Sequence, residues 1–305
     1  MNILNLVNSE NNGRNIIRYK ISKFPDGQQS IQLESVHPNR TLDLISNEPC
    51  KIKSRLNNFS DLELIICATK ALRNLGVQHI ELYIPYLTGA RSDRKFLKGG
   101  VNYIRDVISP ILNSLNFKTI YILDAHSDVV EACIPSLEHI YNYDFVSFAI
   151  RNYFRDSGKI MGDYSKLCFV SPDGGSLKKI YKLTENLGFV GDIITCSKHR
   201  DNDGKLTKTI VPLNQEHLDK DMFIVDDICD GGRTFINIAK TIRETQPERT
   251  GKIYLAVSHG IFSGGFTELG EYFDGIYCTN SFRDISDEEW METNKRNFVK
   301  QMNMF

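Results

Sequence analysis

The sequence lacks paired cysteines and an excess of charge of either sign. Its seven cysteines lie far apart, with no C-x-x-C pair among them, so neither a zinc site nor a dithiol redox centre is expected. The formal net charge is -1 at pH 7, which removes the electrostatic case for nucleic-acid binding. We expect reduced thiols in a cytoplasmic protein whose partners are small molecules or copies of the chain itself.

Long apolar runs are also missing. The chain has no stretch near the roughly 18 apolar residues that a membrane helix requires. Its first residues, MNILNLVNSENNGRN, do not combine a basic segment with a following apolar stretch. We therefore expect neither export nor contact with a membrane.

Short apolar runs alternate with longer amphipathic segments, a pattern typical of parallel sheets flanked by helices. The 305 residues exceed what one hydrophobic core usually organises. The pattern predicts an α/β fold of two tandem domains, residues 1–150 and 151–305, each a mostly parallel sheet flanked by helices.

Individual elements follow from apolar spacing and from helix stop signals. In the first half, the spacing predicts helices at 61–75 and 101–115, the second perturbed by Pro110, and strands at 79–84 and 117–123. In the second half, it predicts strands at 168–170, 192–196, 222–225, 253–257 and 275–278, and a polar helix at 284–305.

Polar residues follow several second-half strands, at 171–175, 198–200, 226–227 and 258–259. Ligands of open parallel sheets bind at the carboxyl ends of the strands. We therefore expect the functional site at this edge.

The segment 226–234 reads Asp-Asp-Ile-Cys-Asp-Gly-Gly-Arg-Thr and lies between a strand and a helical run. Its glycines allow backbone N–H groups to face an anion, and the helix N-terminus adds positive potential. Thr234 could cap the helix and donate its hydroxyl to a phosphate. Asp226 and Asp227 suit two ribose hydroxyls, or a magnesium ion shared with them. The alternative is an ordinary turn beside two solvated acids.

This loop resembles the fingerprint of type I phosphoribosyltransferases, and the chain resembles the ribose-phosphate diphosphokinases (phosphoribosyl-pyrophosphate synthetases) among them. Further matches to that family run in its order at 24–27, 84–86, 90–94, 123–126, 171–175, 198–200, 258–263 and 279–280. The resemblance implies two phosphoribosyltransferase-like domains, 1–150 on the ATP side and 151–305 carrying the ribose-phosphate loop.

The resemblance also implies an enzyme that uses Mg²⁺ and ATP. It would transfer the β,γ-diphosphoryl group of ATP to the anomeric 1-hydroxyl of ribose 5-phosphate, giving phosphoribosyl pyrophosphate and AMP. It further implies a homo-oligomer built from dimers, such as a hexamer, with ATP sites between subunits.

The residues that match the family's functional positions fall into four sets. The implied catalytic pair is Lys198 and Arg200, and the implied magnesium ligands are His126 and Asp173. The implied ATP contacts are Phe24, Asp26, Gln28, Arg91, Ser92, Asp93 and Arg94. The implied ribose-phosphate contacts are Asp226, Asp227, Asp230, Gly231, Gly232, Arg233 and Thr234. No general base is identified.

Several residues depart from the family's pattern. Gly231 and Arg233 stand where it usually has threonine and glycine, so a hydroxyl is lost and a guanidinium gained. A cation beside the phosphate cradle would suit a diphosphate such as that of ADP-ribose, in NAD metabolism. Gln28 and Ser92 also differ from the family's usual residues at ATP positions.

Two other functions use part of the same sequence. A base phosphoribosyltransferase would share the loop at 226–234 but would not need the cations at 91–94 and 198–200. A non-catalytic regulatory subunit would associate with active synthetases, although the four implied catalytic and metal positions favour an enzyme.

Overall fold

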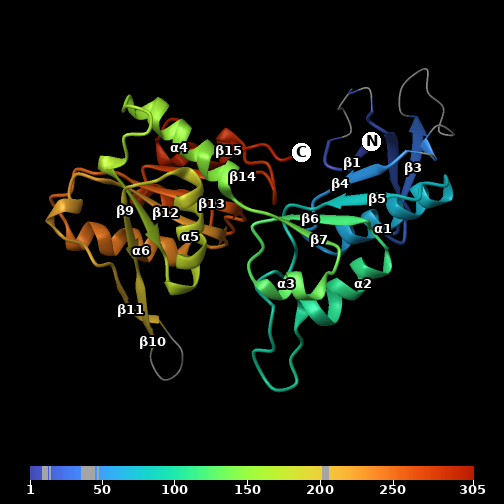
Figure 1. Cartoon of the computed structure of the whole chain (residues 1–305), viewed down its shortest axis with the longest axis horizontal. Helices are drawn as coiled ribbons and strands as arrows, with labels where there is room; N and C mark the ends of the chain where they lie inside the picture. Colours follow the sequence, from blue (N-terminus) through green and yellow to red (C-terminus); the bar gives the residue numbers. More distant parts are fainter. Residues whose placement is uncertain (9–12, 14, 36–44, 47, 201–205) are drawn as a thin grey trace. The chain divides into compact units, whose positions relative to one another are not determined.

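The computed structural model describes residues 1–8, 13, 15–35, 45–46, 48–200 and 206–305, without the side chains of 198–200 and 206–208. The chain forms two compact units, Met1–Tyr141 with Met304–Phe305, and Asn142–Asn303. The sequence predicts a boundary at residue 150, which lies inside helix α4 (Tyr143–Ser157). Each unit is built on a parallel sheet with flanking helices, so the predicted fold class is confirmed (Figure 1).

The first unit contains a five-stranded sheet in the order β1-β4-β5-β6-β7, with all neighbours parallel. Its strands are β1 (Asn2–Asn5), β4 (Cys50–Lys53), β5 (Ile80–Tyr83), β6 (Thr119–Leu123) and β7 (Leu137–Ile140). Its helices are α1 (Phe59–Asn74), α2 (Ser109–Ser114) and α3 (Asp128–Cys133). A separate antiparallel hairpin is formed by β2 (Arg18–Lys23) and β3 (Gln29–Ser35).

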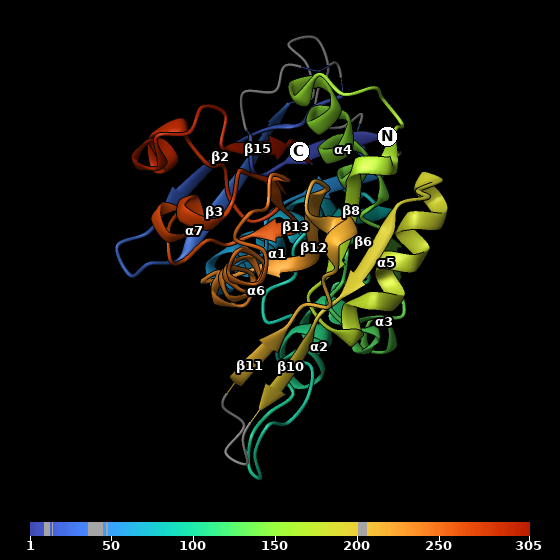
Figure 2. The same cartoon turned by 90° about the vertical axis from the view of Figure 1, so that its left-hand side faces the viewer.

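The second unit contains a six-stranded parallel sheet in the order β15-β14-β13-β12-β8-β9. Its strands β8, β12, β13 and β15 are labelled in Figure 2. Its strands are β8 (Leu167–Ser171), β9 (Asp192–Thr195), β12 (Asp221–Cys229), β13 (Ile253–Gly260), β14 (Gly275–Thr279) and β15 (Val299–Met302). Its other helices are α5 (Gly174–Leu187), α6 (Arg233–Thr245) and α7 (Thr267–Tyr272). The strands β10 (Ser197–Arg200) and β11 (Leu206–Ile210) pair as a hairpin.

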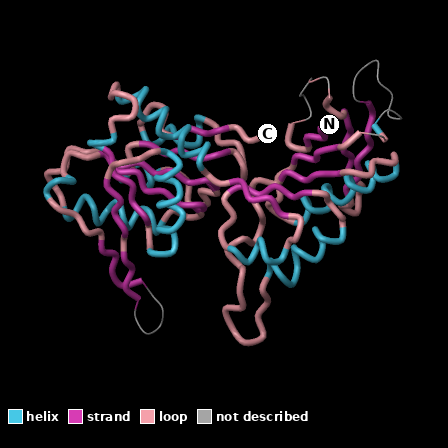
Figure 3. Tube along the Cα trace, viewed as in Figure 1, coloured by secondary structure: helices cyan, strands magenta, loops and turns pink. Residues whose placement is uncertain are grey.

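Both faces of the second sheet are packed. Met222 and Ile224 of β12 join a hydrophobic cluster with residues of α6 and α7. Phe223 and Val225 join another cluster with residues of α4 and α5. Successive strand residues point to opposite faces, so this near-continuous apolar strand is buried on both sides. Figure 3 shows the strands of the structure in magenta and the helices in cyan.

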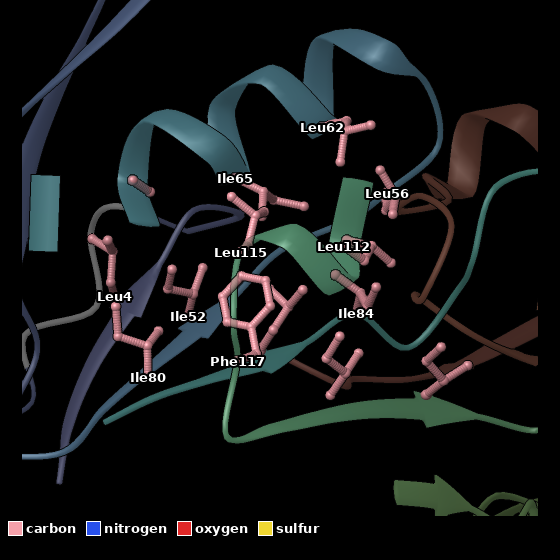
Figure 4. Packing of buried hydrophobic residues seen from close by; sticks show 14 of the residues in the cluster. Leu4, Ile52, Leu56, Leu62, Ile65, Ile80, Ile84, Leu112, Leu115 and Phe117 are labelled. Carbon is pink, nitrogen blue, oxygen red and sulfur yellow. The ribbon is translucent and has the colours of Figure 1, made fainter. Parts of the chain in front are cut away.

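Helix α1 shows how local sequence determines an element of the first unit. The Asn58 side chain caps it, accepting hydrogen bonds from the backbone N–H groups of Ser60 and Asp61 at 2.8 and 3.1 Å. Leu62 and Ile65 then point into the core beside residues of β4, β5 and α2 (Figure 4). Burying each such side chain contributes about 1.5–3 kcal/mol.

The predicted perturbation by Pro110 is confirmed. The helical run begins with a π-helical turn, Ile104–Ile108, and continues as α2, in which Pro110 occupies the first turn. Proline cannot donate the interior hydrogen bond and its ring clashes with the preceding turn, and the wider π turn accommodates both effects.

Two second-half predictions are wrong in detail. The strands β12 and β13 extend past the predicted ends, so they include Asp226 and Asp227, and Ser258 and His259. The predicted polar helix at 284–305 is instead a short 3₁₀ turn, Asp287–Thr293, followed by β15. The segment has no continuous apolar helical face, and its backbone hydrogen bonds are made by pairing with β14 as an edge strand.

All seven cysteines are free thiols, as predicted. Within the described residues, no helix is both long enough and apolar enough to cross a membrane.

Candidate active site

The loop after β12 turns into α6 through a glycine. Gly232 has φ +79° and is the N-cap residue, so Arg233 is the first residue of the helix. A Cβ at Gly232 would lie 3.2 Å from Leu269 Cδ2, and positive φ already disfavours other residues. The prediction that Thr234 caps the helix is therefore wrong, because the glycine begins α6 before that residue.

The start of α6 presents unused donors. The backbone N–H groups of Gly231, Arg233 and Thr234 form no hydrogen bond within the described part of the chain. Such groups at a helix N-terminus bind anions through both hydrogen bonds and the helix dipole. These three N–H groups therefore suit the predicted phosphate site, which is called the phosphate cradle below.

A second loop closes over this cradle. Ile261 donates its backbone N–H to the Cys229 carbonyl at 2.9 Å, and the Ser263 hydroxyl donates to Asp230 Oδ1 at 2.6 Å. Ser263 is a residue of the site that was not predicted from the sequence. Its signal was the family match at 258–263, which adds a hydroxyl next to the loop.

The two neighbouring aspartates have different environments. Asp226 Oδ1 accepts hydrogen bonds from the Ser176 hydroxyl at 3.1 Å and the Asp227 backbone N–H at 3.0 Å. Asp227 Oδ2 lies 3.2 Å from Lys179 Nζ. Burial, followed by the negative charge of Asp227, raises the pKa of Asp226 to about 7. The negative charge of the Asp226 carboxylate is therefore unfavourable in the folded protein at neutral pH.

Asp173, an implied magnesium ligand, caps α5. Its Oδ1 accepts hydrogen bonds from the backbone N–H groups of Gly175 and Ser176 at 3.0 and 3.2 Å. The Ser176 hydroxyl lies 3.3 Å from the same oxygen. Thus α5 begins beside the acidic pair, and metal binding by Asp173 stays a prediction that would involve its Oδ2.

The predicted ATP residues of the first unit lie on two turns. Arg91 and Arg94 are exposed on a loop whose base is tied by the Asn102 side chain, which donates to the Asp93 carbonyl. The Ser92 carbonyl accepts from the Tyr103 backbone N–H at 2.9 Å. These bonds hold the base of the loop and leave both guanidinium groups exposed.

The remaining ATP residues form the turn between β2 and β3. Phe24 donates its backbone N–H to the Gln28 carbonyl at 2.8 Å, and Gln28 donates its own to Asp26 Oδ1 at 3.2 Å. The Phe24 side chain is half exposed. The turn thus presents an aromatic ring to solvent on a well-tied backbone.

Comparisons with known proteins agree on one family. No family model matches the chain. The ribose-phosphate pyrophosphokinase of Pyrococcus abyssi is 27% identical over 257 residues, covering 83% of this chain and 80% of that protein. The enzyme of the same name from Thermosipho africanus is 27% identical over 278 residues, covering 90% of this chain and 81% of its own length.

The phosphoribosylpyrophosphate synthetase of Mycobacterium smegmatis has the same fold. Its crystal structure aligns with 94% of this chain and 86% of its own, with a TM-score of 0.73 and 17% identity. The chain is thus similar in sequence to ribose-phosphate pyrophosphokinases over most of its length and shares the fold of a phosphoribosylpyrophosphate synthetase. It is accordingly an enzyme of the transferase class.

Within this pyrophosphokinase fold, the second unit brings together the acidic pair, Asp173 and the phosphate cradle. Lys198 and Arg200 lie on the backbone of β10, but their side chains are outside the described part of the structure. His126 is exposed after β6 in the first unit, so its sharing of a magnesium ion with Asp173 stays a prediction.

A separate group of potential metal ligands lies at the other end of the second sheet. It consists of Cys168, Asp192 and His217, whose ligand atoms are within 4.8 Å of one another. His217 Nδ1 accepts the Asn214 N–H at 3.1 Å, so the neutral ring carries its proton on Nε2, the atom that faces Asp192. Lys220 already pairs with Asp192. Both features oppose metal binding there.

Proposed function

We propose that this protein transfers the β,γ-diphosphoryl group of ATP to the anomeric 1-hydroxyl of a ribose 5-phosphate moiety. The observation that carries the proposal is the set of unused N–H donors at the start of α6, next to Asp226 and Asp227. The N–H donors suit a phosphate, and the two carboxylates suit ribose hydroxyls. The relatives named ribose-phosphate pyrophosphokinase support the same substrate.

The residues divide the work as follows. The cradle binds the 5′-phosphate, and the aspartates accept hydrogen bonds from the ribose hydroxyls, so the 1-hydroxyl is held for in-line attack. Its oxygen bonds to the β-phosphorus, the bond to the α,β-bridging oxygen breaks, and AMP leaves with that oxygen. Lys198 and Arg200 stabilise the charge on the transferred group.

The residues that the family resemblance implies are compatible with Mg²⁺, because Asp173 of the second unit offers a hard carboxylate oxygen and His126 of the first unit could act through a bound water. The ion would supply charge neutralisation on the phosphates. Arg91, Ser92, Asp93 and Arg94, with Phe24, Asp26 and Gln28, would bind ATP. A dimer-based homo-oligomer, such as a hexamer, and a cytoplasmic location complete the proposal and rest on the family resemblance.

A second acceptor, ADP-ribose, is favoured by one observation. Arg233 is exposed at the first position of α6, and no ion pair engages it within the described residues. A guanidinium there could bind the additional phosphate of a diphosphate. The chemistry would be unchanged, and the product would be ADP-ribose carrying a 1-diphosphate, a reaction of NAD metabolism.

The test incubates the protein with ATP, Mg²⁺ and either acceptor. Chromatography measures the AMP released, and phosphorus NMR identifies the product. The expected result is AMP equal to the 1-diphosphate product. Arg233→Gln should reduce turnover of ADP-ribose more than that of ribose 5-phosphate, whereas Lys240→Gln, on an exposed part of α6, should change neither. A protein that releases no AMP with either acceptor contradicts the proposal, and one that stimulates an active synthetase instead supports a regulatory subunit.

A further inference from the structure

We propose that Lys179 is a positioning residue of the ribose-binding site, fixing the Asp227 carboxylate so that the two neighbouring aspartates keep separate, defined orientations. The inference rests on the proposed function, because it takes Asp226 and Asp227 as the groups that bind ribose hydroxyls.

The ion pair joins a helix to a buried strand. Lys179 Nζ lies 3.2 Å from Asp227 Oδ2, and the two side chains are 37% and 7% exposed. A carboxylate buried to this degree requires a paired cation or several hydrogen-bond donors to remain charged. Lys179 supplies that cation from outside the strand.

The alternation of β12 explains why Asp227 faces Lys179. Phe223 and Val225 have the same parity as Asp227, and they pack with Ile180 and Leu183 of α5. The side chain of Asp227 is therefore directed toward α5. The ion pair is consistent with the packing of the whole helix on this face.

Asp226 has its own partner on the same helix. The Ser176 hydroxyl lies 3.1 Å from Asp226 Oδ1, and Ser176 and Lys179 are three residues apart, which places them on one face of α5. One helical turn thus contacts both carboxylates by different groups. Two like charges at adjacent positions would otherwise repel and reorient.

The neighbouring Lys178 is the matched control. It is exposed on the same helix and forms no ion pair within the described residues. Lys178→Met makes the same replacement of a lysine by methionine one residue away, on another side of α5.

The experiment compares the kinetics of Lys179→Met, Lys179→Gln, Lys179→Arg and Lys178→Met, using the better of ribose 5-phosphate and ADP-ribose as acceptor. Lys179→Met and Lys179→Gln should raise the acceptor KM about tenfold and change the ATP KM less than about twofold. Lys179→Arg should restore most of the acceptor affinity, and Lys178→Met should behave as wild type. Thermal melting of each variant establishes that it is folded.

The outcomes separate the two proposals. An unchanged acceptor KM in both uncharged variants, or an equal rise in both KM values, overturns the positioning role. If the wild type releases no AMP, the proposed reaction is wrong. Calorimetric titration of the wild type and Lys179→Met with ribose 5-phosphate then tests the role of Lys179 in binding. Weaker binding to Lys179→Met supports the role of Lys179, whereas equal binding or no binding to the wild type overturns it.

Discussion

The two units have similar sheets but hold their polar site residues differently. The second sheet is packed by hydrophobic clusters on both faces, and its acidic pair lies in a buried strand. Within the described residues, the first unit has one such cluster, and the other face of its sheet carries Lys51, Glu81 and Tyr121. Lys51 Nζ lies 3.1 Å from Glu81 Oε2 and 4.2 Å from the Tyr121 ring centroid.

This difference suggests two ways of presenting charge. In the second unit, burial fixes carboxylates in place and shifts a pKa. In the first unit, backbone turns hold guanidinium groups that stay exposed to solvent and so avoid the cost of burying a charge. Substitutions of polar site residues should therefore affect stability mainly in the second unit, while those in the ATP loop should affect binding alone.

The largest effect should come from Phe223→Ala. Phe223 is fully buried among aromatic rings, including Tyr254 and Tyr277 at 5.0 and 5.6 Å between centroids. Its truncation should lower the free energy of unfolding by about 3–5 kcal/mol, from lost burial and the cavity left behind. Urea denaturation followed by the emission of Trp290, the only tryptophan, reports on this unit.

The matched change in the first unit is Tyr121→Ala, on the partly exposed face of β6. It should cost about 1 kcal/mol, mostly from the contact with Lys51. Calorimetric unfolding measures both variants. Equal losses for the two substitutions would show that the faces of the sheets do not differ as the packing indicates.

An effect smaller than that of Phe223→Ala, and of opposite sign, is expected from Asp226→Asn. The folded-state pKa of Asp226 is raised to about 7, so the native state binds its proton more tightly than the unfolded state does. The stability from this proton is present below the unfolded pKa of about 4 and is lost as pH rises through the folded pKa. The asparagine variant avoids that loss and should be more stable than wild type by on the order of 2 kcal/mol at pH 8.

Melting temperatures from pH 4 to 8 test this difference, which should grow with pH. Asp93→Asn, on the partly exposed loop of the first unit, should change stability by less than about 0.5 kcal/mol at every pH. Asp226→Asn should also weaken acceptor binding. If the variant is no more stable than wild type at pH 8, the pKa of Asp226 is not raised in the folded protein.

The sequence predicted the parts of the fold that depend on local patterns. The helix at 61–75 was confirmed because its apolar spacing is nearly regular over one element. The turn into α6 was also predicted, since its glycines mark it, but the loop is shorter than the predicted 226–234, because β12 extends to Cys229 and α6 begins at Arg233. In contrast, β15 was missed, because a short edge strand of four half-buried residues, without alternation between buried and exposed positions, has little signal of its own.

The support around the acidic pair could not be predicted from local sequence. Lys179 and Asp227 are 48 residues apart along the chain, and only the packing of α5 on the sheet brings them together. The spacing of Ser176 and Lys179 after the cap at Asp173 was the available signal. It became informative only once Asp173 was known to begin a helix.

The smallest effect on stability should come from Arg94→Ala, which would sharpen the contrast between the units. The Arg94 guanidinium is exposed and lies 5.3 Å from the centroid of the exposed Phe96 ring, so its removal should change the free energy of unfolding by less than about 0.5 kcal/mol. The proposed ATP contact would nevertheless be lost, and the ATP KM should rise roughly tenfold. Lys98→Ala, on the same exposed loop, is the control and should change neither quantity. An unchanged ATP KM for Arg94→Ala would remove this residue from the ATP site, and a large loss of stability would show that the loop is part of the core of the first unit.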